Sequence, residues 1–210
     1  MPEARDDSRT TRRRGRTSSR WYLRLLYLLY PPLSLLPEYR EALNIARRYS
    51  CGRVVELGSA RCNLGRLLLG RGLADLYVGV DLDPPPRPWD PRAACVQADA
   101  LSPPLAGTFD CAFFINSLFY IGLRALRAYL SLARVVVIID IEPTPRYLLN
   151  YLGDAAEGRI RMTYADLGRA LAELGASVLE SRRGAQYYYV IARPTASESC
   201  EQAREAHAPL

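Results

Sequence analysis

The sequence predicts an α/β fold, a doubly wound, mostly parallel seven-stranded sheet that ends in an antiparallel hairpin. Strand-like and helix-like segments alternate along the chain, which is typical of a parallel sheet. The central strands are unbroken apolar runs, as in FDCAFFI and ARVVVIID, and such runs indicate a sheet covered on both faces. Only Arg183-Gly184-Ala185 separates the last two strands, so these two form a hairpin.

The strands are short apolar or β-branched segments bounded by turn residues. The expected strands are Arg53–Leu57, Leu76–Asp81, Ala93–Gln97, Phe109–Ile115, Ala133–Asp140, Ser177–Arg182 and Gln186–Arg193. The helices follow apolar residues at helical spacing, and two have start signals: a proline in the first turn of the second helix, and Thr163-x-x-Asp166 before the last. The expected helices are Trp21–Tyr30, Pro37–Ser50, Asn63–Gly72, Ile121–Leu132 and Tyr164–Leu174.

The chain divides into four parts by composition. Residues 1–19 contain almost no apolar residues and are expected to be a disordered basic tail. Residues 20–50 hold two helices that we expect to cap the sheet, and residues 51–194 form the main domain. Residues 195–210 are polar again and are expected to be a disordered tail.

The positive charge is concentrated in the first tail. The chain has 28 basic and 22 acidic residues and a net charge of +6, and every basic residue is an arginine. Five arginines crowd one short stretch: Arg12, Arg13, Arg14, Arg16 and Arg20. Such a stretch is either a solvated tail or a contact for RNA phosphates or a membrane surface.

Histidine and cysteine usage excludes several kinds of site. The only histidine is His207, in the C-terminal tail, so no histidine-dependent triad or imidazole-rich metal site can form. The five cysteines contain no CxxC spacing and no even framework, which argues against a zinc site. Free thiols in a reducing, cytoplasmic compartment are therefore the expected state.

The most informative stretch runs from Arg53 to Asp83. A strand ending in Glu56-Leu57 enters a turn at Gly58, a helix follows, and the next strand ends in Asp81, 23 residues after that glycine. Such a turn lets a ligand approach the backbone and meet the helix N-terminus, and the acid is placed to accept hydrogen bonds from ribose hydroxyls. The pattern indicates an adenosine-containing cofactor.

Two common cofactor classes do not fit this turn. Nicotinamide enzymes need G-x-G-x-x-G, whereas the turn here reads Gly58-Ser59-Ala60-Arg61-Cys62-Asn63. A phosphate-binding Walker loop needs a lysine, and the chain has none.

The sequence from about Leu26 to Arg193 resembles class I S-adenosylmethionine-dependent methyltransferases, most closely the small-molecule enzymes typified by those of quinone biosynthesis. The similar segments are VVELG, GVDLD, VQADA, FDCAFFINSLFY and the final hairpin, with LYPPLSLLPEYREAL similar to the cap helices. The resemblance implies a Rossmann-like methyltransferase fold with S-adenosyl-L-methionine as cofactor. It implies that the cofactor is bound by Glu56, Gly58, Ser59, Ala60, Asp81, Leu82, Asp99, Ala100 and Asn116.

The chain departs from the family pattern in the glycine-rich turn. The family continues G-x-G-x-G, and Ala60 and Cys62 stand at the two later glycine positions here. Glycine at such positions permits left-handed backbone and close approach. The departure leaves open a non-catalytic binding protein with a degenerate cofactor site.

Candidate catalytic residues are Asn116, Tyr120 and Asp140, at or near the carboxyl ends of strands, with Glu142 close by. Methyl transfer from a sulfonium needs positioning and exclusion of water more than it needs a strong base. A hydroxyl acceptor would in addition need a proton acceptor.

The expected function is methylation of a small or lipid-like molecule, because aromatic residues of the first helix could line a pocket for an apolar methyl acceptor: Trp21, Tyr22, Tyr27 and Tyr30. The alternatives are an RNA methyltransferase that uses the arginine-rich tail, or the binding protein named above. Two observations argue against methylation of nucleic-acid bases. The fourth-strand motif reads INSL and not the N-P-P-Y typical of enzymes that methylate amino groups of bases, and no Pro-Cys is present to supply the nucleophile that attacks cytosine.

Overall fold

The computed structural model describes residues 36–82, 89–102, 105–142 and 163–194. The expectations for the two tails and for the helix Trp21–Tyr30 fall outside these residues. The strands are β1 (Arg53–Leu57), β2 (Leu76–Asp81), β3 (Ala93–Gln97), β4 (Phe109–Ile115), β5 (Ala133–Ile141), β6 (Ala176–Arg183) and β7 (Tyr187–Pro194). The described helices are α2 (Pro37–Arg48), α3 (Asn63–Gly70), α4 (Leu118–Ile121), α5 (Arg124–Leu132) and α7 (Tyr164–Glu173).

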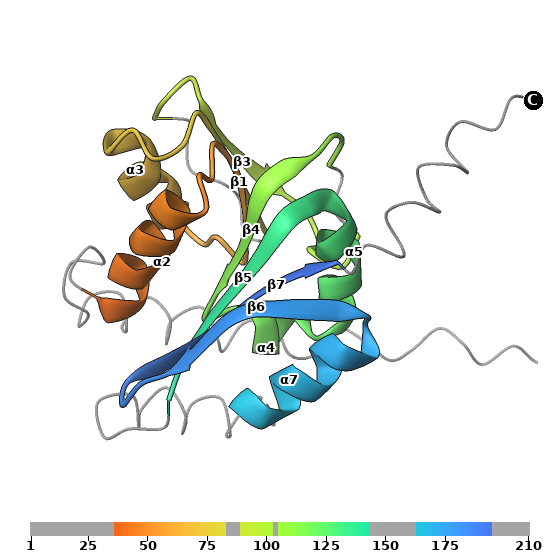
Figure 1. Ribbon diagram of the computed structural model, residues 1–210. Helices are drawn as coiled ribbons and strands as arrows, with labels where there is room; N and C mark the ends of the chain where they lie inside the picture. The colour runs from red at the N-terminus through yellow and green to blue at the C-terminus, as the bar shows by residue number, and fades with distance from the viewer. Residues whose placement is uncertain (1–35, 83–88, 103–104, 143–162, 195–210) are drawn as a thin grey trace, which may run out of the picture. The chain divides into compact units, whose positions relative to one another are not determined.

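The strands form one seven-stranded sheet in the order β3-β2-β1-β4-β5-β7-β6 (Figure 1). Strands β1 to β5 run parallel to one another, and β7 is antiparallel to both β5 and β6. The expected fold class is confirmed. The chain moves outward from β1 in both directions, so the order reverses between β1 and β4, which is where open α/β sheets bind ligands.

Helices cover both faces of the sheet because successive strand residues point to opposite sides. On one face, the α2–α3 face, Val54 and Phe113 pack with Ile45 of α2 and Leu68 of α3. On the other, the α5–α7 face, side chains of the same strands pack with α5 and α7: Val55, Phe114, Ile138, Leu126 and Leu167. The continuous apolar runs of the sequence therefore supply two cores at once.

One predicted helix is divided in the structure. The segment Ile121–Leu132 was expected to be a single helix, but α4 ends at Ile121 and α5 begins at Arg124. Gly122 lies between them with φ +95° and ψ 157°, a conformation open to glycine and incompatible with a continuing helix. The short α4 was not expected from the sequence.

Two disulfides correct the expectation of free thiols. Cys51 is joined to Cys111 and Cys62 to Cys95, across 60 and 33 residues of sequence. The first pair links the segment before β1 to β4, whose Cys111 is the register partner of Val54. Sequence spacing could not reveal either pair, because each forms only once the strands lie side by side.

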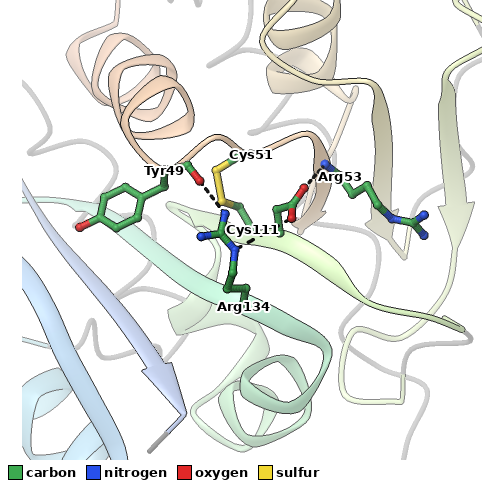
Figure 2. Close-up of a disulfide and its surroundings, with 6 residues drawn as sticks. Tyr49, Cys51, Arg53, Cys111 and Arg134 are labelled. Carbon is green, nitrogen blue, oxygen red and sulfur yellow. Dashed lines mark hydrogen bonds and ion pairs between the residues drawn. A yellow bond between two sulfur atoms is a disulfide. The ribbon is translucent and has the colours of Figure 1, made fainter.

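Polar contacts surround the Cys51–Cys111 disulfide at the amino ends of β1 and β4 (Figure 2). Arg134 of β5 donates from Nη2 to the carbonyl oxygen of Tyr49 at 2.6 Å. The backbone N–H of Arg53 donates to Oδ2 of Asp110 at 2.7 Å. These contacts hold the amino ends of the strands together, whereas the turn after β1 lies at their carboxyl ends.

Among the helices that the structure describes, none is long and apolar enough to cross a membrane.

Candidate active site

The turn after β1, residues 58–62, has three left-handed residues. Gly58, Ala60 and Cys62 have φ of +68°, +47° and +55°. These are the positions at which the sequence resemblance expects glycine. Ala60 and Cys62 thus keep the backbone that glycine would favour, although left-handed geometry costs a non-glycine residue about 1–2 kcal/mol.

Hydrogen bonds to β2 hold this turn in place. The N–H groups of Gly58 and Ser59 both donate to the carbonyl oxygen of Val80, at 2.9 and 3.2 Å. The N–H of Ala60 donates to Oδ2 of Asp81 at 2.7 Å. Asp81 is the acid expected to meet the ribose, so the turn and the acid form one unit.

Gly58 is required by its contact with the segment after β4. A Cβ at Gly58 would lie 2.6 Å from Cβ of Ser117, which is closer than side chains pack. Ser117 is buried and donates from Oγ to the carbonyl oxygen of Leu57 at 2.6 Å. The ends of β1 and β4 are thereby locked together at the point where the strand order reverses.

Glu56 points to the α2–α3 face and is closed off from solvent. Its side chain is 2% exposed and accepts a hydrogen bond from the Tyr77 hydroxyl. Burial raises the pKa of Glu56 to about 8, with a further rise from the nearby charge of Asp81, while the bond from Tyr77 acts in the opposite direction. Glu56 is therefore mostly protonated at neutral pH, and its side chain is bonded to Tyr77 of β2.

The residues after β2 and β3 supply a polar group and apolar surface. Asp99 is exposed and accepts from the N–H of Leu101 at 2.9 Å, while Ala100 is buried. Five large apolar side chains are exposed in the described part of the chain, and three of them lie in the segments that come after strands β2, β3 and β4: Leu82, Leu101 and Tyr120, at 58%, 45% and 45%. Apolar surface thus gathers at the carboxyl ends of the parallel strands.

Asn116 occupies a special position at the end of β4. Its φ is +52°, and its N–H donates to the carbonyl oxygen of Ile139 at 2.9 Å. Strict alternation would turn its side chain away from the face of Ile115. Instead, Nδ2 donates to Oε1 of Glu38 on α2 at 3.4 Å, and the buried Oδ1 has no hydrogen-bond partner among the described residues.

The other candidate residues lie apart from this contact. Tyr120 is on α4, with its ring 3.8 Å from that of Phe119, measured between centroids. Asp140 lies within β5, is 3% exposed, and accepts from the N–H of Ile141 at 2.8 Å. Glu142 is paired with Arg183 of β6 at 2.7 Å. The described contacts join the turn to Asp81 and, through Ser117, to the segment after β4 that begins with Asn116.

Three residues of this region were not expected from the sequence. Glu38, Tyr77 and Ser117 each contact a predicted site residue, as described above. One sequence signal was present for the first, because Glu38 and Glu41 are two acids three residues apart on the predicted helix Pro37–Ser50; the structure buries both. Tyr77 and Ser117 look like ordinary strand and turn residues, and only their neighbours give them a role.

Two further features of the described residues bear on the site. No group of three or more His, Cys, Asp or Glu side chains among them could hold a metal ion. A hollow of about 290 Å³ lies at the β6–β7 turn, lined by Arg182, Gly184, Ala185, Gln186 and Tyr187, and it contains none of the expected site residues.

No model of a known protein family matches the chain, and no curated protein matches it. Solved structures do share its fold. Magnesium protoporphyrin IX methyltransferase (ChlM) from Synechocystis PCC 6803 with bound SAH has a TM-score of 0.53 and 15% identity, over 75% of this chain and 84% of that one. The N-methyltransferase NodS from Bradyrhizobium japonicum WM9 has a TM-score of 0.55 and 15% identity, over 77% and 98%.

The [4+2]-cyclase SpnF also matches, with a TM-score of 0.57 and 13% identity over 73% of this chain and 80% of that one. At these identities the likeness concerns the fold. The chain has the seven-stranded α/β fold of class I S-adenosylmethionine-dependent methyltransferases, and the cyclase indicates that this fold also hosts other chemistry.

Proposed function

We propose that this chain, which has the fold described above, is an S-adenosylmethionine-dependent methyltransferase that acts on a small or lipid-like molecule. The observation that carries the proposal is the turn 58–62, in which Ala60 and Cys62 adopt the left-handed backbone of the glycines they replace. The two substitutions that favoured a degenerate site therefore keep the left-handed backbone that glycine would adopt, which supports cofactor binding at this turn.

The residues around the turn fit the proposed cofactor. Asp81 is the last residue of β2 and already accepts one N–H from the turn. A carboxylate has about four acceptor positions, so this bond is compatible with a ribose hydroxyl. Asp99 and the backbone of Ala100 would meet the adenine, and Leu82 and Leu101 offer exposed apolar surface for a ring.

Asn116 supports a polar contact near the reacting end of the cofactor. A buried acceptor without a partner is costly, and Oδ1 of Asn116 is such an atom. An amine of the cofactor or an N–H or O–H of the acceptor would satisfy it. Glu38 holds the other end of the same amide through Nδ2, which keeps Oδ1 directed away from Glu38.

The chemistry asked of these residues is mainly positioning. When bound, S-adenosylmethionine supplies an activated methyl group. The chain must hold a nucleophile about 3 Å from that group, in line with it, and keep water out. Asn116 can orient the acceptor but cannot take a proton, so thiols, amines and acidic carbons suit the site better than unactivated alcohols.

A small or lipid-like acceptor is supported by the exposed ring of Tyr120, which offers an apolar platform beside the end of β4. ChlM and NodS, whose names describe methyl transfer to a porphyrin and to nitrogen, use the same fold. Because the [4+2]-cyclase SpnF shares the fold, cofactor binding and methyl transfer have to be tested separately.

The test is calorimetric titration of the full chain with S-adenosylmethionine, for the wild type, Asp81→Asn and Asp75→Asn. Asp75 is the matched control, because it is an exposed acid that directly precedes β2, at the other end of the strand that ends in Asp81. We expect binding by the wild type and by Asp75→Asn, and binding weakened by about 1–3 kcal/mol in Asp81→Asn.

Two results would overturn the proposal in different ways. Absence of binding by the folded wild type would remove the cofactor and leave only the fold. Equal binding by Asp81→Asn and the wild type would remove Asp81 from the site. Methyl transfer itself is tested with the tritium-labelled methyl group of the cofactor and a panel of amine, thiol and phenol acceptors.

A further inference from the structure

The disulfide between Cys62 and Cys95 is attached directly to the proposed cofactor turn. Cys62 is the last residue of the turn and the N-cap of α3. Cys95 lies in the middle of β3, and its register partner in β2 is Gly79. The bond therefore starts in the turn, crosses over β2 at Gly79, and ends on the edge strand of the sheet.

Gly79 shows how closely this bond is packed. A Cβ at Gly79 would lie 2.6 Å from Sγ of Cys62 and 2.7 Å from Oγ of Ser59. The Oγ of Ser59 in turn lies 3.6 Å from Sγ of Cys62. The sulfur atom of Cys62 thus sits on the bare backbone of β2 and touches a second residue of the turn.

The same bond holds a backbone conformation that cysteine avoids. Cys62 has φ +55°, and a left-handed non-glycine residue persists where its surroundings hold it. The backbone bonds of Cys62 are local: its N–H donates to the carbonyl oxygen of Ser59 at 2.7 Å, and its own carbonyl accepts from Arg66. The disulfide is its covalent link to another strand.

The two disulfides differ in how a reductant could reach them. Cys51 and Cys111 are both fully buried, at 0% exposure. Cys62 is also at 0%, but Cys95 is only partly buried and stands on an edge strand. Cys95 is therefore the most accessible of the four bonded cysteines, and attack of a thiolate from solvent is expected at its sulfur, with Cys62 as the leaving group.

We propose that the Cys62–Cys95 disulfide is a redox switch of the turn 58–62, and through the turn of cofactor affinity; the second part rests on the proposed function. The reductant is a dithiol. Its first thiolate attacks Sγ of Cys95 and releases the thiolate of Cys62, and its second thiol closes the reductant's own disulfide. Two electrons and two protons pass from the dithiol to the pair, which ends as two thiols.

Reduction changes the turn because two thiols need more room than a bonded pair. Sγ of Cys62 cannot withdraw toward the sheet, since Gly79 and Ser59 already enclose it. The separation must come from Cys62 and the start of α3, or from β3. Cys62 then loses the tether that maintains its left-handed backbone, and the turn relaxes from the geometry that the cofactor needs.

The test uses the full chain with Cys200→Ser, so that the fifth thiol cannot exchange. Affinity for S-adenosylmethionine is measured by calorimetry before and after treatment with dithiothreitol, and alkylation with mass spectrometry identifies which cysteines are reduced. We expect selective reduction of Cys62 and Cys95 and roughly tenfold weaker binding, which corresponds to about 1.4 kcal/mol. Reoxidation should restore the affinity.

Matched variants separate a switch from general destabilisation. Cys62→Ser/Cys95→Ser should bind like the reduced protein and no longer respond to dithiothreitol. Cys51→Ser/Cys111→Ser, which removes the disulfide at the opposite edge, should keep the full response. Equal affinity of oxidised and reduced protein, or loss of the response in the second variant, would overturn the proposal.

Amide hydrogen exchange of the ligand-free protein distinguishes failure of the switch from failure of the proposed function. We expect reduction to accelerate exchange at residues 58–66 and to leave the β4 and β5 amides unchanged. If exchange in the turn is unchanged by reduction, the redox switch is ruled out whether or not the cofactor binds. If reduction produces the expected change in exchange but the oxidised protein does not bind the cofactor, the turn responds to redox state and the methyltransferase assignment fails.

Discussion

The backbone N–H of Ala60 donates a 2.7 Å hydrogen bond to Oδ2 of Asp81, across 21 residues of sequence. The bond joins the turn after β1 to the acid at the end of β2. The bond is made by a residue with left-handed backbone, at φ +47°, and this conformation directs the N–H of Ala60 toward Asp81.

Replacing Ala60 tests this bond without touching Asp81. Ala60→Pro removes the N–H and imposes φ near −65°, so we expect cofactor affinity to fall at least about tenfold. Ala60→Gly keeps the N–H and adopts the left-handed region without strain, and should bind at least as tightly as the wild type. Calorimetric titration compares the three proteins, and equal affinity in the proline variant would contradict the assignment.

Gly79→Ala tests the packing of the turn on β2. The added methyl would meet Cys62 and Ser59 at distances below 3 Å, so we expect the free energy of unfolding to drop by about 1–3 kcal/mol. Gly70→Ala, at the end of α3, adds the same atom where nothing lies within 4 Å, and should be neutral or stabilising by about 0.5–1 kcal/mol. Urea unfolding measures both, and similar midpoints would show that the space over Gly79 is not limiting.

Glu56→Gln tests the buried carboxyl. Folded protein keeps a proton on Glu56 up to its pKa of about 8, whereas the unfolded chain releases it near the ordinary value of 4.5. Between these values the folded state binds more protons, so stability falls as the pH rises, by up to about 1.4 kcal/mol per pH unit. The stabilisation is fully present below the unfolded value and gone above the folded one.

The glutamine variant cannot titrate at this position. We expect its unfolding free energy to change much less than that of the wild type between about pH 5 and about pH 8. Glu173→Gln, at an exposed position on α7, should keep the wild-type slope. Parallel curves for wild type and Glu56→Gln in denaturant titrations would show that Glu56 is ionised in the fold.

Glu38 and Asn116 are expected to be energetically coupled through their 3.4 Å contact. Asn116→Asp keeps a residue that tolerates left-handed backbone, but it sets a carboxylate against Glu38, so we expect a loss of about 1–3 kcal/mol at neutral pH. Adding Glu38→Gln should recover much of that loss, because one of the facing carboxylates becomes an amide. A double-mutant cycle with no coupling would contradict the contact.

The Cys51–Cys111 disulfide is expected to contribute to stability and not to cofactor binding. It closes a loop of 60 residues, which in the chain-entropy model stabilises the fold by about 4 kcal/mol. Cys51→Ser/Cys111→Ser should lower the urea midpoint accordingly while keeping the affinity for S-adenosylmethionine. A change below about 0.5 kcal/mol would mean that the surrounding contacts in Figure 2 already hold this edge.

The sequence by itself determined the order and most bounds of the strands. The predicted limits of β1 to β4 agree with the structure, and β5 extends one residue further, to Ile141. Long apolar runs can be read in this way because burial on both faces removes polar residues from a strand. The hairpin could also be predicted, because the few residues around Gly184 that separate the last two strands are too short for any other connection.

The tertiary structure alone decided what the site residues contact. Glu56 faces Tyr77, Asn116 faces Glu38, and Cys62 is bonded to Cys95. None of these pairs is close in sequence, and each depends on strand register or on a single left-handed residue that re-aims a side chain. Local patterns report which face a residue prefers, whereas a contact between two side chains depends on how distant segments are placed, and that placement is set by the packing of the whole sheet.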